Sequence, residues 1–87
     1  MHSVLTDYNA VRALQTQENQ QAAVKILSCT ARQWKLPIEI ITETKLSLGV
    51  VGRVLYLLTR TQQLEKRQLT NWSDGTPRVM YKAVPKQ

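Results

Sequence analysis

The clearest hydrophobic pattern begins after Ser47, where apolar residues repeat with helical spacing. The apolar positions are Val50, Val51, Val54, Leu55, Leu57 and Leu58. At about 100° per residue they form one broad buried band, and Ser47 is a good helix N-cap. The opposite arc contains Gly49, Gly52, Arg53, Tyr56 and Arg60. This pattern predicts a long amphipathic helix that packs on more than one partner.

A strand pattern follows directly. Val79, Tyr81 and Ala83 alternate with Arg78, Met80 and Lys82. An alternation of period two is typical of a strand, and Asp-Gly is a strong signal for a tight hairpin turn. We therefore expect a β-hairpin with strands near 66–72 and 78–84, a turn at Asp74–Gly75, and a stop at Pro85.

Two further helices are expected before this unit. In residues 3–15, Leu5, Tyr8 and Val11 recur at three-residue spacing. Ala23, Ile26 or Leu27, Thr30 or Ala31, and Trp34 line one face of a second helix over 17–34. The first helix would supply a dimer contact or pack on the core of its own domain, and the sequence leaves both open.

Pro37 ends the second helix and suits the first turn of the next, predicted over 38–45. Ile38 and Ile41 are expected to share a side of it, with Leu46 just beyond, while Glu39 and Glu43 point outward. An extended piece around Leu36 could pair with the hairpin as a third strand.

The net charge of +6 is unevenly distributed along the chain. Residues 1–44 contain four basic and four acidic residues, whereas residues 45–87 contain eight basic and two acidic ones. The whole excess therefore belongs to the long helix, the hairpin and the tail. A one-sided basic surface is typical of a polyanion binder, although a generic basic surface is the simpler alternative.

Several functional classes are disfavoured. The chain has no apolar run of about 18 residues, as a membrane span requires, and no pattern of a signal peptide. Cys29 and His2 are single residues of their types and form no metal-ligand set. Glu39 and Glu43 lack a third acid or a histidine for catalysis. We expect a cytoplasmic, nucleoid-associated protein that is no enzyme and has no cofactor, metal or small-molecule ligand.

The order helix, short helix, turn, helix and basic hairpin resembles the winged helix-turn-helix family of small bacterial, phage or plasmid transcription regulators. In 41–47, with Val51 and Val54 further on, the spacing is similar to that of the helix-turn-helix core. Residues 74–81 look like the wing of the family. The family often has alanine where Ile41 stands and glycine where Lys45 stands.

This resemblance implies an α+β fold with a three-helix core, a C-terminal β-hairpin wing and an extra N-terminal helix. It divides the chain into an N-terminal helical extension, 1–15, and a winged helix-turn-helix domain, 16–85. It implies a regulator that binds duplex DNA with its second motif helix in the major groove, and a homodimer formed through the N-terminal helix is expected.

Carried over by position, the resemblance assigns DNA contacts to both elements. In the helix these are Ser47, Leu48, Gly49, Gly52, Arg53, Tyr56 and Arg60, and in the wing Asn71, Ser73, Thr76, Arg78 and Lys82. Arg53 is the best base reader of this set, because a guanidinium can donate two hydrogen bonds to guanine. Tyr56 and Arg60 are expected to contact phosphate instead.

Two other functions remain open. Gly49 and Gly52 each destabilise a helix by about 1 kcal/mol relative to alanine. We expect a compensating advantage, which would be the close approach of a DNA groove or of another helix. The second case would suit a winged helix that acts as a protein-interaction module in a replication or plasmid-maintenance assembly. An RNA-binding winged helix is the other alternative.

Overall fold

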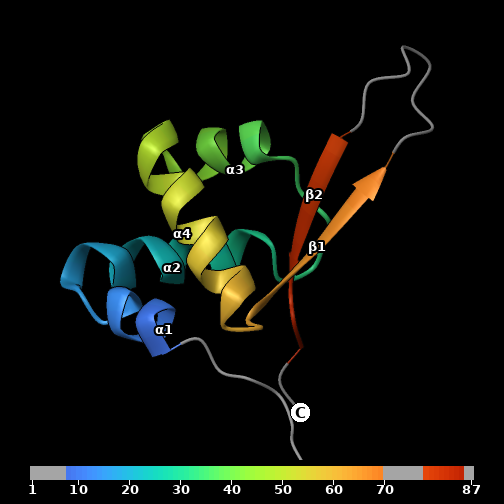
Figure 1. The fold of residues 1–87 in the computed structure, drawn as a ribbon. Coiled ribbons are helices and arrows are strands. Elements are labelled where there is room, and N and C mark those ends of the chain that lie inside the picture. Colours follow the sequence, from blue (N-terminus) through green and yellow to red (C-terminus); the bar gives the residue numbers. More distant parts are fainter. Residues whose placement is uncertain (1–7, 70–77, 86–87) are drawn as a thin grey trace, which may run out of the picture.

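The computed structural model describes residues 8–69 and 78–85, which form four helices followed by a two-stranded antiparallel sheet (Figure 1). The elements are α1 (Tyr8–Leu14), α2 (Gln17–Cys29), α3 (Pro37–Thr44), α4 (Leu48–Arg60), β1 (Leu64–Leu69) and β2 (Arg78–Ala83). The predicted α+β class is confirmed, and the order of the elements is that of a winged helix-turn-helix with an additional N-terminal helix.

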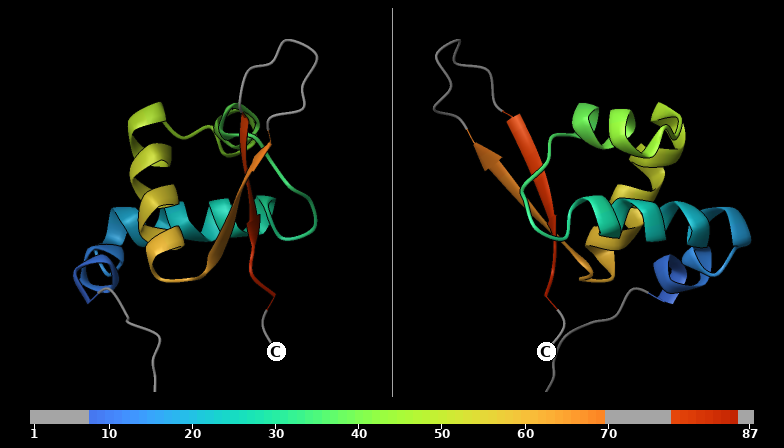
Figure 2. Two further views of the ribbon diagram at one scale, coloured as in Figure 1. Left: turned by 45° about the vertical axis from the view of Figure 1, so that its right-hand side comes forward. Right: turned by 180° about the vertical axis from the view of Figure 1, so that it is seen from behind.

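Helix α4 packs against all the other helices and against β1, and its position in the middle of the fold is visible in Figures 1 and 2. Val54 and Leu58 are fully buried, in a core that also contains Ile26 of α2 and Ile40 of α3. The Ser47 side chain accepts a hydrogen bond from the Val50 N–H at 3.2 Å, which confirms the predicted cap. The predicted exposed arc is confirmed, and so is the buried band of α4, except that Val50 is half-buried.

The N-terminal helix belongs to the same packed unit. Ala10 of α1 is buried, and the helix contacts both α2 and α4. The predicted start of this helix near residue 3 falls outside the described residues. Where it is described, α1 therefore packs on the core of its own domain.

Helix α2 ends five residues before the predicted limit of Trp34, so that expected boundary is wrong. The Thr30 hydroxyl donates to the Ile26 carbonyl at 2.8 Å and closes the last turn. Beyond it the chain pairs with β2. The Thr30 carbonyl accepts from the Ala83 N–H, and Lys35 and Tyr81 exchange two backbone hydrogen bonds at 2.9 Å.

The expected extended piece near Leu36 thus exists as a one-residue bridge at Lys35. It attaches the hairpin to the helices, together with Leu64 of β1, which is buried in the core. Strands β1 and β2 pair from Leu64 opposite Ala83 to Leu69 opposite Arg78. The predicted turn at Asp74–Gly75 lies outside the described residues.

Helix α3 faces the core with a different side from the one predicted. Ile40 is 0% exposed and Thr44 is buried, whereas Ile38 is 64% exposed and Ile41 is half-buried. Ile40 and Thr44 are four residues apart and therefore share one face, which packs against α2 and α4. The Glu39 carboxylate accepts from the Leu36 N–H at 2.8 Å and caps the helix start.

The turn between α3 and α4 is formed by a lysine in an unusual conformation. Lys45 has a φ of 60° and a ψ of 23°, and its N–H donates to the Ile41 carbonyl at 2.8 Å. This left-handed conformation favours glycine, which is the residue that the winged helix-turn-helix family often has at this position. The turn therefore keeps its geometry although the residue differs.

None of the described helices is long and apolar enough to cross a membrane. Cys29, at the end of α2, is half-buried and packs against the core.

The observed side of α3 leads to a matched pair of substitutions. We expect Ile40→Ala to lower the free energy of unfolding by about 2–5 kcal/mol, because it leaves a cavity in the core. Ile38→Ala should change it by less than about 0.5 kcal/mol, since that side chain is exposed. Urea denaturation followed by circular dichroism measures both. Equal losses would contradict the orientation of α3.

Candidate nucleic-acid interface

The exposed arc of α4 contains the helix residues that the resemblance assigns to DNA. Leu48, Gly49, Gly52, Arg53, Tyr56 and Arg60 are all exposed. They lie on one surface because the buried band occupies the rest of the helix. Ser47 precedes them as the cap, and its hydroxyl oxygen is engaged by the Val50 N–H.

Arg53 is held by two residues of α2. Its Nε donates to Asn19 Oδ1 at 3.1 Å, and its Nη2 donates to Glu18 Oε1 at 2.7 Å. The guanidinium therefore has a fixed direction, although the Arg53 side chain remains 46% exposed. These partners were missed from the sequence because they lie 34 and 35 residues away and no local pattern points to them.

Asn19 connects three helices. It is only 7% exposed, and its Nδ2 donates to the carbonyl of Ala13, near the end of α1, at 2.8 Å. Its Oδ1 accepts from Arg53 on α4. The amide thus uses a donor and its acceptor inside the domain, and it fixes both α1 and the Arg53 side chain relative to α2.

The two glycines of α4 face open space. A Cβ atom added to Gly49 or Gly52 would meet nothing within 4 Å. Packing within the described part of the chain therefore does not require glycine at either position. Because glycine has no side chain, the backbone of α4 is uncovered at these two positions, and another molecule can come close to it.

A groove of about 360 Å³ runs between α4, the start of α3 and the hairpin. We call it the α4–hairpin groove. It is lined by Pro37, Leu48, Val51, Gly52, Leu55, Tyr56, Thr59, Arg60, Lys66 and Tyr81. Its floor is largely apolar, and Arg60 and Lys66 bring positive charge to it from two different elements. Among the described residues that line it there is no carboxylate.

The groove adds Lys66 to the candidate surface. From the sequence, Lys66 is expected only as part of the first strand of the hairpin, without a contact to α4. In the sheet it pairs with Tyr81, whose pKa is raised by burial. The sequence of β1 gives no signal for this contact, because four exposed polar residues follow Leu64, and it becomes evident only from the hairpin register.

Two of the predicted wing residues are described. Arg78 and Lys82 are half-buried positions of β2, and Lys82 pairs in register with Glu65. Next to Lys66, Arg67 lies over the Trp34 ring, with its Cζ 4.5 Å from the ring centroid. The other wing candidates, Asn71, Ser73 and Thr76, lie outside the described residues.

The carboxylates of α3 have structural partners. Glu43 accepts from Lys35 Nζ at 2.6 Å, and this hydrogen bond raises the pKa of the Lys35 ammonium group. Glu39 caps the helix. Burial raises the pKa of the nearby Cys29 thiol, Glu43 adds to this rise, and Lys35 opposes it. Among residues 8–69 and 78–85, no three histidine, cysteine or acidic side chains form a metal-binding group.

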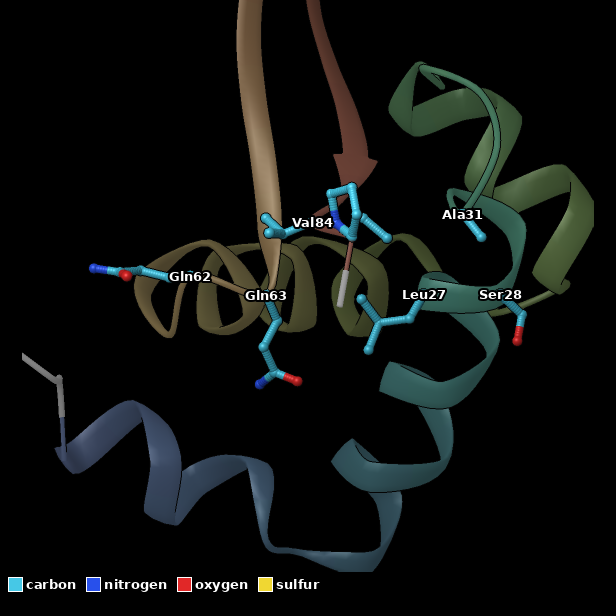
Figure 3. Close-up of a pocket in the computed structure, with 8 residues that line it drawn as sticks. Leu27, Ser28, Ala31, Gln62, Gln63 and Val84 are labelled. Atoms are coloured by element: carbon cyan, nitrogen blue, oxygen red, sulfur yellow. The ribbon is translucent and has the colours of Figure 1, made fainter. Parts of the chain in front are cut away.

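A second hollow of about 510 Å³ lies at the other end of the hairpin (Figure 3). It is bounded by the end of α2, the turn between α4 and β1, and the residues that follow β2. Its lining is Leu27, Ser28, Ala31, Gln62, Gln63, Ala83, Val84 and Pro85. None of these described side chains has an ionisable group.

Comparison with protein-family models and with curated proteins found no match. Among solved structures, the fold is similar to that of a protein named "Possible transcriptional regulator" from Methanosarcina mazei Go1. The TM-score is 0.68 at 18% sequence identity, over 91% of this chain and 66% of that one. At this identity the likeness shows the shared fold alone. The chain spans slightly less than two thirds of the length of that protein.

The position of Asn19 leads to a prediction about stability. Asn19→Ala should lower the free energy of unfolding by about 1–3 kcal/mol, because Arg53 Nε loses its acceptor and a buried link to α1 disappears. Glu18→Ala should cost less than about 1 kcal/mol, since that ion pair is exposed to solvent. Chemical denaturation of both variants measures the difference. A larger loss for Glu18→Ala would show that the ion pair, rather than the amide, holds Arg53.

Proposed function

We propose that this protein binds duplex DNA through α4 and the hairpin, and that it acts as a transcription regulator. The supporting observation is that basic residues of two elements, Arg60 of α4 and Lys66 of β1, both line the groove beside the exposed arc of α4. The whole net charge of +6 belongs to the half of the chain that contains these elements. Positive groups along a helix and an adjoining hairpin suit the phosphates on both sides of a major groove.

In this proposal the two ends of the surface have different tasks. The first turns of α4, with Ser47, Leu48, Gly49 and Gly52, enter the major groove. Tyr56 and Arg60 contact the backbone. Arg78 and Lys82 contact phosphates from the hairpin, and Asn71, Ser73 and Thr76 are further wing candidates. Phosphate contacts fix the orientation of the protein, and base contacts supply the sequence preference.

The direction of the Arg53 guanidinium is restricted by its partners on α2. Hydrogen bonds to Glu18 and Asn19 already occupy its Nη2 and Nε. The guanidinium has five N–H donors, and these contacts use one on Nε and one on Nη2. The edge formed by Nη1 and Nη2 can therefore donate two hydrogen bonds to guanine, or contact a phosphate, while both α2 contacts are kept. We therefore propose Arg53 as a base reader whose direction is set by Glu18 and Asn19.

The proposal is tested by the salt dependence of duplex binding. The logarithm of affinity should fall linearly with the logarithm of salt concentration, with a slope of about −0.9 for each phosphate contact. Arg78→Gln should weaken binding to all sequences by a similar factor and reduce the slope by about 0.9. Fluorescence anisotropy with labelled duplexes measures both quantities.

Lys25→Gln is the matched control, because it removes one positive charge from the exposed side of α2, away from α4 and the hairpin. It should leave the slope unchanged. Absence of salt-dependent binding to any duplex would overturn the proposal and favour a protein-interaction module. Tighter binding to duplex RNA than to duplex DNA would favour the RNA alternative.

We further infer that α1 supplies a contact for a homodimer. Tyr8 at its start is 76% exposed, while Ala10 on the same helix is buried. An exposed aromatic side chain on a helix that is already fixed to the core suits a contact between two copies. Removing the whole helix would expose the core, so a point change is the appropriate test.

Tyr8→Ser should weaken the dimer by at least about tenfold, the loss expected from a contact worth about 1.4 kcal/mol or more. Sedimentation velocity over a concentration series measures the dissociation constant. Val24→Ser, which changes an exposed apolar residue of α2, should leave it unchanged. A chain that is monomeric without any substitution would refute the dimer, and equal effects of both changes would refute the assignment to α1.

A further inference from the structure

The exposed arc of α4 offers mainly apolar contact at the positions where a base reader is expected to offer hydrogen bonds. We propose that α4 reads the C5-methyl group of pyrimidines through Leu48. This inference rests on the proposed binding of duplex DNA. The inference goes beyond that function by naming the group on the base pair that α4 recognises.

The polar groups near the start of α4 are already in use within the domain. Ser47 Oγ accepts the Val50 N–H at 3.2 Å as the helix cap. Arg53 is directed toward α2 by Glu18 and Asn19. Gly49 and Gly52 have no side chain. Hydrogen bonds to base edges are therefore left to the Nη1–Nη2 edge of Arg53 at this end of the helix, in the direction that α2 sets.

Leu48 is the side chain that remains. It is the first residue of α4 and is 72% exposed. Side chains four residues apart are neighbours on a helix surface, and Gly52 occupies that position relative to Leu48. Gly49 and Gly52 both face open space. The isobutyl group of Leu48 therefore projects from a low surface and can reach the floor of a groove.

The surroundings of Leu48 are apolar as well. It lines the α4–hairpin groove together with Pro37, Val51 and Leu55, while Arg60 and Lys66 bring the positive charge there. Leu48 and Arg60 are at opposite ends of α4, about 18 Å apart along the helix axis. An apolar contact at one end of the groove and cations at the other suit a base edge that carries a methyl group and phosphates that lie further along the DNA. In the major groove, thymine presents its C5-methyl group, which is read by apolar side chains. A cytosine methylated at C5 presents the same group.

Four duplexes of equal length and charge test the proposal without knowledge of an operator. Two are alternating A·T and A·U sequences, which differ only in the C5-methyl group. The other two are alternating G·C sequences with cytosine or 5-methylcytosine. Affinities are measured by anisotropy at one low salt concentration for the unchanged protein and for Leu48→Ala. The substituted residue is exposed, so the variant should fold normally.

The unchanged protein should bind A·T about fourfold more tightly than A·U for each methyl group that it covers, the factor expected from burying one methyl-sized group. Methylated G·C should exceed unmethylated G·C by a similar factor if the methyl group alone is read, and an effect confined to A·T would assign the preference to thymine. Leu48→Ala should reduce the A·T to A·U ratio toward one. Ile38→Ala, an exposed apolar change on α3 outside the groove lining, should retain the ratio.

The outcomes separate this inference from the function beneath it. Salt-dependent binding with equal affinity for A·T and A·U would overturn methyl readout and leave DNA binding intact. A preference for A·T that survives Leu48→Ala would assign it to DNA shape and overturn the part played by Leu48. Absence of binding to all four duplexes would overturn the proposed function itself.

Discussion

Burial of one side of α4 is the constraint on which the rest of this structure depends. The helix packs on α1, α2, α3 and β1, and Val54 and Leu58 are completely removed from solvent. Full burial of one such side chain contributes about 1.5–3 kcal/mol, so no other rotation of the helix can compete. The same burial leaves a single arc exposed. The residues of the candidate interface therefore share one surface because core packing buries the opposite side of α4.

The hairpin is placed by a second set of contacts, made mostly by the backbone. Lys35 and Tyr81 exchange two hydrogen bonds, and the Thr30 carbonyl binds the Ala83 N–H. These contacts use the segment between α2 and α3, which helps to explain why α2 stops at Cys29. They also set the distance between β1 and α4, and hence the groove in which Arg60 and Lys66 meet. The segment between α2 and α3 thus helps to position the proposed wing against α4.

Local patterns were sufficient for the features that depend on local physics. The band and arc of α4 and the Ser47 cap follow from periodicity and helix-end chemistry, and all of them are observed. The end of α2 and the partners of Arg53 depend on contacts with distant residues, so no local pattern could reveal them. The side of α3 was misassigned because its three isoleucines allow two helical phases, and only the packing on α2 and α4 selects Ile40. The left-handed conformation of Lys45 was equally hidden, since lysine gives no sign of it.

The Arg53 contacts change what can be expected of this surface. Asn19, which is 7% exposed, and Glu18 together occupy the Nε–Nη2 edge of the guanidinium and fix its direction, while the Nη1–Nη2 edge can still bind another molecule. Base reading by Arg53 therefore requires the loss of neither contact, but it is restricted to the direction that α2 sets for the guanidinium. Leu48 is exposed, and the glycines beside it leave room for a base edge. The two side chains offer different contacts on one arc, because Arg53 can donate hydrogen bonds to a base or a phosphate and Leu48 can make an apolar contact with a methyl group.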